Sequence, residues 1–374
     1  MSDLVTRKIP FFNYAALFKS HEVEFLEAIG DVCRRGAYIL QDDLKRFEAA
    51  MREFLKVKYA FGVADGTNAL ILGLRAMGIQ PGDEVIVPSH TYVASAAAIH
   101  FVGATPVLAD CLPDHLVDPA SIKALITPRT RAVMPVHLNG RTCTMDPLLA
   151  LAKQFDLQII EDAAQALGSK YRGQSAGTFG AVGTISFYPA KILGCFGDGG
   201  LVMTNDDAIG QKLTMLRDHG RTSEGEVGCW GTNCRLDNLQ AAILLVNFKH
   251  LGAAIARRRE IAKMYQTELS GIGDLTLPPA MNDDTHFDVF QNYEMESGRR
   301  DELRSYLLER GVSTLIQWGG KAVHQLTALG FESSNLPRTE LLFQRCLMLP
   351  MNVTLTDDDV SYICRCVRDF YAER

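Results

Sequence analysis

The chain has 374 residues, of which 47% are hydrophobic and 22% are charged, and its formal net charge is −6. This balance is that of a globular protein, and the length favours two domains over a single core. Nucleic acids and anionic membranes require a clustered basic surface. The two signs of charge are interspersed here, so we expect neither partner.

The N-terminal segment MSDLVTRKIPFFNY lacks the apolar core of a signal peptide, and no apolar run is long enough to span a bilayer. The nine cysteines are scattered, without a disulfide framework or a zinc-type spacing. We therefore expect free thiols, no metal site and a cytoplasmic location.

Short runs rich in Val, Ile and Phe alternate with helical patterns through the first 250 residues. A strand-like run at 59–65 precedes a helical pattern at 66–78, and one at 83–89 precedes a pattern at 92–103. Further strand-like runs lie at 105–111, 131–140, 157–164, 183–189 and 199–205. Apolar strands separated by helices predict a mostly parallel seven-stranded sheet covered on both faces. Such sheets bind ligands at the carboxyl ends of their strands.

The pattern changes after residue 250. Residues 250–269 read as a long helix with a basic surface, and shorter strand-like and helix-like pieces follow. We expect a large α/β domain at 1–250, including an N-terminal arm, and a smaller α+β domain at 251–374.

The stretch ADGTNAL, residues 64–70, lies between a predicted strand and a predicted helix. Gly66 permits close approach of the backbone, and the next amides and the Thr67 hydroxyl point out of a helix N-terminus. That arrangement can bind a phosphate. An Asp-Gly-Thr sequence also makes a good turn and helix cap, and this stretch alone does not decide between the two readings.

The stretch IIEDAAQALG, residues 159–168, ends a predicted buried strand with Asp162. A buried carboxylate requires a partner, and a protonated pyridine nitrogen would suit it. Gln165 is close enough to face the same ligand. The alternative is that Asp162 caps a following helix.

Lys191 follows a predicted strand in SFYPAKILGCFGDGG, residues 186–200, and glycines surround it. A desolvated lysine loses its proton and can condense with a carbonyl, whereas a lysine in a loop is usually solvated. Ser186, at the end of the same strand, offers a hydroxyl to an anion. A phosphate site, a strand-end aspartate and a strand-end lysine in this order meet the needs of pyridoxal 5′-phosphate. Lys191 would be its covalent anchor and then the general acid/base.

Several separated segments resemble the DegT/DnrJ/EryC1/StrS family of pyridoxal-phosphate-dependent nucleotide-sugar aminotransferases. They are GAYILQDDLKRFEAAMREFLKVKYAFGVADGTNAL (36–70), EVIVPSHTYVASAAAI (84–99), EDAAQALGSKYRG (161–173), SFYPAKILGCFGDGG and GTNCRLDNLQAA (231–242). The resemblance covers nearly the whole chain. It implies an aspartate-aminotransferase-like fold, that of the fold type I pyridoxal-phosphate enzymes.

The resemblance also implies roles for individual residues. Gly66, Thr67 and Ser186 match phosphate-binding positions, and Lys191 matches the lysine that forms the Schiff base. Tyr92 matches an aromatic ring stacked on the cofactor.

Asp162 matches the aspartate on the pyridine nitrogen, and Gln165 the residue that bonds the ring hydroxyl. Asn233 matches an asparagine that reaches the phosphate of the neighbouring subunit, which implies a homodimer with a shared site. Arg235 is a candidate anion contact. Without the resemblance, Asn233 and Arg235 read as an ordinary turn and surface pair.

The implied reaction moves an amino group from L-glutamate to a keto sugar on a nucleoside diphosphate. The PAKILGCFGDGG segment is more similar to members that aminate 3-keto sugars than to those that act on 4-keto sugars. The same cofactor residues would serve an aminotransferase for a cyclitol or amino-acid ketone, or a non-catalytic regulator that binds the cofactor.

The segment IQWGGKAVHQL departs from the family pattern, with Gln317 and Trp318 in place of a histidine and a tyrosine. His324 still matches a later histidine. These positions lie toward the expected sugar-nucleotide side, so Trp318 and His324 are candidate substrate contacts. A core or interface tryptophan is the alternative for Trp318.

Overall fold

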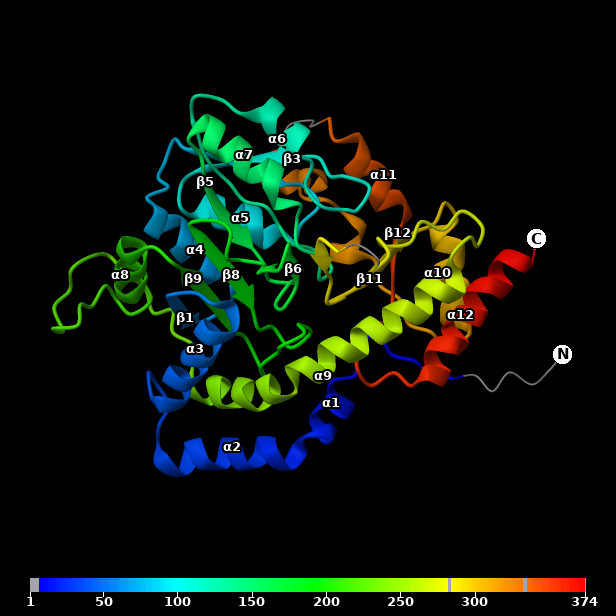
Figure 1. The fold of residues 1–374 in the computed structure, drawn as a ribbon, viewed down its shortest axis with the longest axis horizontal. Coiled ribbons are helices and arrows are strands. Elements are labelled where there is room, and N and C mark those ends of the chain that lie inside the picture. Colours follow the sequence, from blue (N-terminus) through cyan, green and yellow to red (C-terminus); the bar gives the residue numbers. More distant parts are fainter. Residues whose placement is uncertain (1–6, 282–283, 332–334, 374) are drawn as a thin grey trace.

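The computed structural model describes residues 7–281, 284–331 and 335–373, and the seven predicted strands form one sheet within them (Figure 1). The order across the sheet is β1 (Tyr59–Val63), β9 (Gly200–Thr204), β8 (Val182–Ser186), β5 (Gln158–Asp162), β4 (Thr130–Val133), β2 (Glu84–Pro88) and β3 (Thr105–Ala109). Only β9 runs antiparallel to its neighbours, β1 and β8. The predicted mostly parallel α/β fold is confirmed.

Helices bury both faces of this sheet, because side chains alternate from face to face along each strand. On β9, Val202 joins the core formed with α4 (Gly66–Met77), whereas Leu201 and Met203 join the core formed with α3 (Asp42–Leu55). Two-sided burial explains why the strand runs are apolar throughout. The other helices of this part are α5 (Val93–Phe101), α6 (Pro119–Leu125), α7 (Met145–Phe155) and α8 (Asp207–Leu216).

A smaller α+β unit follows, with its own hydrophobic core. Its two antiparallel strands are β11 (Tyr293–Glu296) and β12 (Cys346–Leu349). Its helices are α10 (Arg300–Glu309), α11 (Pro337–Arg345), α12 (Asp357–Ala372) and the short 3₁₀ turns η1 (Gln317–Gly320), η2 (Val323–Gln325) and η3 (Thr327–Leu329). A small separate sheet joins β10 (His286–Phe287) to β6 (Lys170–Tyr171) and β7 (Gln174–Ser175).

The two units share one long helix, α9 (Asn238–Leu269), which crosses the proposed boundary at residue 250 without a break. Helices α1 (Tyr14–Ser20) and α2 (Glu22–Arg35) lie beneath it (Figure 1). α9 is long and apolar enough to cross a membrane by length and composition, but it packs against α2, α3 and α12. It is therefore a core helix of this fold.

The N-terminal segment lies on the smaller unit. Ile9 is buried in the core of that unit and pairs with Val312, and Arg7 forms a 3.0 Å ion pair with Asp359 of α12. All nine cysteines are free thiols, as expected.

Candidate active site

The carboxyl ends of β1, β5 and β8 meet at one edge of the sheet and carry the predicted cofactor residues. Gly66, the first residue of α4, lies directly against Ser186 at the end of β8. A Cβ added to Gly66 would stand 2.9 Å from the Cβ of Ser186, closer than real contacts allow. A glycine is therefore required for the start of α4 to approach this strand.

Asp65 is the N-cap of α4. Its carboxylate accepts a hydrogen bond from the amide of Asn68 at 2.8 Å, and its carbonyl accepts one from the amide of Ala69. The first-turn amides of a helix have no partner within the helix, so those of Gly66 and Thr67 remain for an anion. The capping reading is confirmed at Asp65, and it leaves the next two amides free for the predicted phosphate contact.

Asp162 ends β5 with only 5% of its surface exposed. Its Oδ2 accepts a 2.7 Å hydrogen bond from the Ser95 hydroxyl, and its Oδ1 accepts one from the Ala164 amide at 3.1 Å. Residues 163–169 form turns, so the alternative that Asp162 caps a helix is wrong. Two donors hold a buried carboxylate in one orientation, ready for a cationic partner.

Lys191 is half-buried in the turn after β8, where its amide donates to the carbonyl of Tyr188 at 2.8 Å. Burial lowers the pKa of its amine to about 8, although the nearby Asp162 carboxylate opposes that change. Such an amine is partly neutral near pH 8 and so is a competent nucleophile. Lys191 lines a pocket together with Tyr14, Arg258 and Thr354.

Gln165 is held by its carbonyl oxygen. Its Oε1 accepts hydrogen bonds from the Asn139 amide at 2.9 Å and from Asn292 Nδ2 at 3.2 Å. The remaining donor group of the side chain, the NH₂, is the part available to a ligand.

Tyr92 stands at the N-cap of α5 with 56% of its surface exposed. The substrate candidates lie near the same loop, because His324 Nδ1 is 2.7 Å from the hydroxyl of Ser89, the residue after β2. The ring of Trp318 packs on His90 at 5.1 Å between centroids, in the same loop. The residues after β2 and the segment around η1 and η2 are thus brought together.

Asn233 and Arg235 lie at the base of the loop after α8, which projects from the body (Figure 1). Asn233 is exposed and bridges to Asp218, which also forms a 3.0 Å ion pair with Arg235. Among the described residues, no hydrogen bond or ion pair links Asn233 or Arg235 to Lys191.

A family model described as the DegT/DnrJ/EryC1/StrS aminotransferase family matches residues 19–368. The chain belongs to this family. It is 41% identical over 373 residues to a dTDP-3-amino-3,4,6-trideoxy-α-D-glucose transaminase of Streptomyces venezuelae, covering 99% of this chain and 97% of that one. It is 38% identical over 362 residues to a UDP-N-acetyl-3-dehydro-α-D-glucosamine 3-aminotransferase of Acidithiobacillus ferrooxidans, covering 96% and 97%.

A solved structure, S. venezuelae DesV in complex with a ketimine intermediate, superposes with a TM-score of 0.94 and 40% identity. The match covers 99% of this chain and 100% of DesV. The chain is therefore a sugar aminotransferase of the DegT/DnrJ/EryC1/StrS family, and the expected family, fold and enzyme class are confirmed.

Members of the DegT/DnrJ/EryC1/StrS family use pyridoxal 5′-phosphate, and solved relatives carry its pyridoxamine form. The residues present fit this cofactor. Because residue 66 is a glycine, the first turn of α4 can lie directly against Ser186. The free amides of that turn and the Ser186 hydroxyl can then bind the same phosphate. Asp162 has a buried carboxylate that would pair with a protonated ring nitrogen, and burial depresses the pKa of Lys191 into the range of a nucleophile.

The sequence did not predict several residues that orient this site. Ser95, Asn139 and Asn292 hold Asp162 or Gln165, and Arg258 and Tyr14 line the pocket at Lys191. They come from helices and loops far apart in the chain. Ser95 lies in the segment 84–99, where it is a polar residue among the small apolar residues of 93–99.

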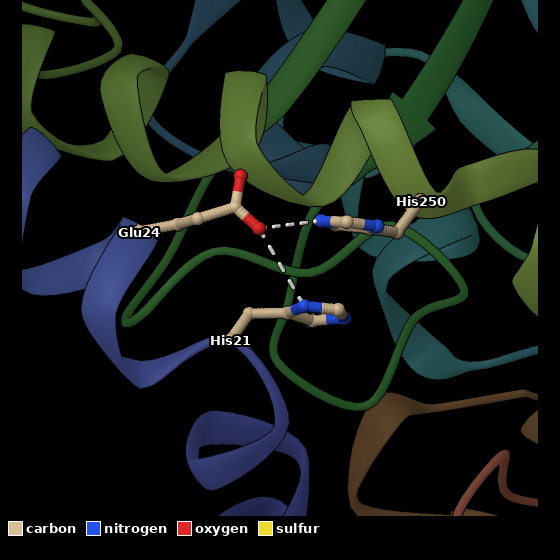
Figure 2. A group of neighbouring side chains, drawn as sticks. All are labelled: His21, Glu24 and His250. Atoms are coloured by element: carbon tan, nitrogen blue, oxygen red, sulfur yellow. Dashed lines mark hydrogen bonds and ion pairs between the residues drawn. The ribbon is translucent and has the colours of Figure 1, made fainter.

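His21, Glu24 and His250 form a separate cluster between the start of α2 and α9 (Figure 2). Glu24 Oε1 lies 2.9 Å from His250 Nε2 and 3.7 Å from His21 Nδ1. The two imidazole rings stack with centroids 3.7 Å apart and planes 10° apart. A metal ion lies near the plane of each imidazole that binds it, and these parallel rings share no plane. The observed arrangement is that of polar contacts between two helices.

Proposed function

We propose that the protein transfers an amino group from L-glutamate to C3 of a keto sugar carried by a nucleoside diphosphate. The observation that carries this proposal is the convergence of Lys191, Asp162 and the Gly66 cradle at one edge of the sheet. The names of two relatives, at 41% and 38% identity, both place the amino group at C3. They differ in the nucleotide, dTDP or UDP, so their names favour the position more strongly than the nucleotide.

Each residue has a defined part in this proposal. The amides of Gly66 and Thr67 and the Ser186 hydroxyl bind the phosphate, and Tyr92 stacks on the ring. When bound, pyridoxal phosphate supplies an electron sink for the bond that breaks at the amino carbon.

Asp162 keeps a proton on the ring nitrogen by charge pairing, and Gln165 donates its NH₂ to the ring oxygen. Lys191, whose amine has a pKa of about 8, takes the proton from the substrate carbon that bears the amino group and delivers it to the C4′ carbon of the cofactor. In the second half of the reaction it moves a proton in the opposite direction.

The working unit in this proposal is a cytoplasmic homodimer in which Asn233 of each chain completes the phosphate site of the other. The loop that leads to Asn233 carries Trp230 and Val227, which expose 91% and 70% of their surface. Large apolar side chains on a projecting loop favour a contact with a second copy. Mixed dimers of Lys191→Ala and Asn233→Ala chains would regain activity, because one of their two sites has both residues. No recovery would contradict the shared site.

The test of the reaction is mass spectrometry of the product formed from glutamate and either a 3-keto or a 4-keto nucleotide sugar. We expect 2-oxoglutarate and an aminated product from the 3-keto substrate, with the 4-keto substrate slower. Amination only at C4, or only of a keto-cyclitol, would overturn the proposed substrate. If glutamate leaves the absorbance of the bound cofactor unchanged, the non-catalytic regulator is favoured instead.

A further inference from the structure

The segment Phe290–Asn292 of the smaller unit reaches the two cofactor residues that lie on the larger one. Gln291, 4% exposed, uses both ends of its amide on the turn that carries Lys191. Its Oε1 accepts a 2.7 Å hydrogen bond from the Ile192 amide, and its Nε2 donates a 2.7 Å bond to the Ala190 carbonyl. These two peptide groups flank Lys191, so one side chain holds the backbone on both sides of it.

The next residue, Asn292, holds Gln165. Its Nδ2 lies 3.2 Å from Gln165 Oε1 and 3.0 Å from Asn139 Oδ1. An amide NH₂ can only donate, so both acceptors must turn their oxygens toward it. Together with the Asn139 backbone amide, which donates to the same oxygen at 2.9 Å, Asn292 directs the Gln165 oxygen into the protein and leaves its NH₂ for the cofactor position.

The segment that presents these two side chains is itself rigidly held. Arg258 of α9 is buried, and its Nη1 donates to the carbonyls of Phe290, Gln291 and Met351 at 2.9–3.1 Å. Burial lowers the pKa of this guanidinium to about 10, so it stays charged at neutral pH. The hydrogen-bond partners of this buried charge are backbone carbonyl groups.

Phe290 adopts a left-handed backbone conformation with φ of 51°, which is costly for an aromatic residue. The loop that contains Gly140 packs directly against this turn, since a Cβ added to Gly140 would stand 2.5 Å from the amide nitrogens of Phe290 and Gln291. A strained turn persists only where its surroundings enforce it, and such turns cluster at functional sites.

We propose that Gln291 and Asn292 are positioning residues for the aminotransferase reaction. Gln291 sets the backbone on both sides of Lys191, and Asn292 sets the orientation of the Gln165 amide. The smaller unit thus aligns the lysine and the ring-oxygen donor through two consecutive residues. The part assigned to Asn292 rests on the role proposed above for Gln165.

The test of Asn292 uses the holoenzyme and the substitutions Asn292→Asp and Gln165→Leu. The measurement is the pH midpoint of the absorbance change of the bound cofactor. A hydrogen bond donated to the ring oxygen stabilises its negative charge and eases loss of the neighbouring proton. Gln165→Leu should therefore raise the midpoint by about one pH unit. Asn292→Asp replaces a donor with acceptors, which favours the reversed Gln165 amide, and should raise the midpoint in the same direction.

Asn292→Asp also adds a negative charge, which raises the midpoint without acting through Gln165. In the double variant the combined shift should therefore be smaller than the sum of the two single shifts, because the part that acts through the Gln165 hydrogen bond is already lost. Independent shifts, or no shift with Asn292→Asp while Gln165→Leu moves the midpoint, would overturn the inference and leave the Gln165 role intact. No shift with Gln165→Leu would instead overturn the role of Gln165 itself, and the part of Asn292 with it.

The test of Gln291 uses Gln291→Met, which keeps the length of the side chain and removes both hydrogen bonds. The rate at which pyridoxal phosphate becomes attached to Lys191 in the apoprotein should fall about tenfold, and kcat should fall with little change in the KM for sugar. Gln266→Leu is a matched control, because it removes a hydrogen bond to the adjacent Tyr293 and touches neither Lys191 nor Gln165. Equal attachment rates in wild type and Gln291→Met would overturn the assignment.

Discussion

The hydroxyl of Ser95 donates a 2.7 Å hydrogen bond to the carboxylate of Asp162. The same hydroxyl lies 2.7 Å from that of Thr91, four residues earlier in the loop before α5. Ser95 is buried and belongs to α5, whereas Asp162 ends β5, so the contact joins two separate layers of the fold. It fixes the carboxylate that is expected to face the ring nitrogen.

Replacing Ser95 should therefore lower the catalytic rate of the enzyme without unfolding it. Ser95→Ala removes a hydrogen bond to a charged group, which is worth about 1.5–3 kcal/mol, so kcat should fall by about tenfold to a hundredfold. Thr91→Val acts one bond further away and should cost less. Steady-state kinetics with cofactor in excess would measure both, and wild-type turnover of Ser95→Ala would contradict the role given to this contact.

The pH dependence of cofactor attachment reports the pKa of Lys191. Its neutral amine is the reactive form, and burial lowers its pKa to about 8. The rate at which apoprotein acquires the cofactor's visible absorbance should rise about tenfold per pH unit below pH 8 and level off above it. In Asp162→Asn the plateau should begin at lower pH, since that carboxylate raises the pKa. A wild-type plateau near pH 10 would refute the depressed pKa.

Lys191→Ala should bind the cofactor weakly through its phosphate, and should lose the yellow colour and all turnover. Borohydride treatment of the wild-type holoenzyme should leave a pyridoxyl group on Lys191, located by peptide mass spectrometry, and none on the variant. Retained turnover in Lys191→Ala would rule out its part as acid and base.

A methyl group at Gly66 should damage the phosphate site, because its Cβ would stand 2.9 Å from that of Ser186. We expect Gly66→Ala to raise the Kd for pyridoxal phosphate at least tenfold, equivalent to about 1.4 kcal/mol. Ser186→Gly removes the atom that clashes. Gly66→Ala combined with Ser186→Gly should therefore bind the cofactor no worse than Ser186→Gly alone, as measured by equilibrium titration. Additive losses would show that the clash is not the cause.

His115 should stabilise the protein in a pH-dependent way. Burial alone would lower its pKa, but hydrogen bonds to Glu294 at 2.8 Å and Glu296 at 3.1 Å raise it to about 9. Since this pKa lies above the unfolded value of 6.5, the contribution is complete below pH 6.5 and is lost as the pH rises through 9. His90 and Arg338 also act on these two glutamates.

The difference in unfolding free energy between wild type and His115→Gln should accordingly be larger at pH 6.5 than at pH 9.5, by up to about 3 kcal/mol. Denaturant unfolding at the two pH values measures it. A difference that does not change with pH would show that His115 is neutral in the folded protein.

The seven strands were predictable from the sequence because burial on both faces makes most positions of most strands apolar. The glycine at 66, the aspartate at 162 and the lysine at 191 could be singled out because they lie at or shortly after the ends of such strands, and parallel strands bring their ends to one edge. The boundary between the two units was harder to predict from the sequence, because one helix, α9, continues through residue 250.

The sequence by itself determined the fold class, the cofactor and the residues expected to bind it, because local patterns at strand ends encode them. Only the tertiary structure decided how those residues are held. Ser95 on Asp162, Asn292 on Gln165 and Gln291 beside Lys191 join segments 67 to 127 residues apart. No periodicity along the chain specifies such contacts, because they depend on how the helices and the smaller unit pack against the sheet.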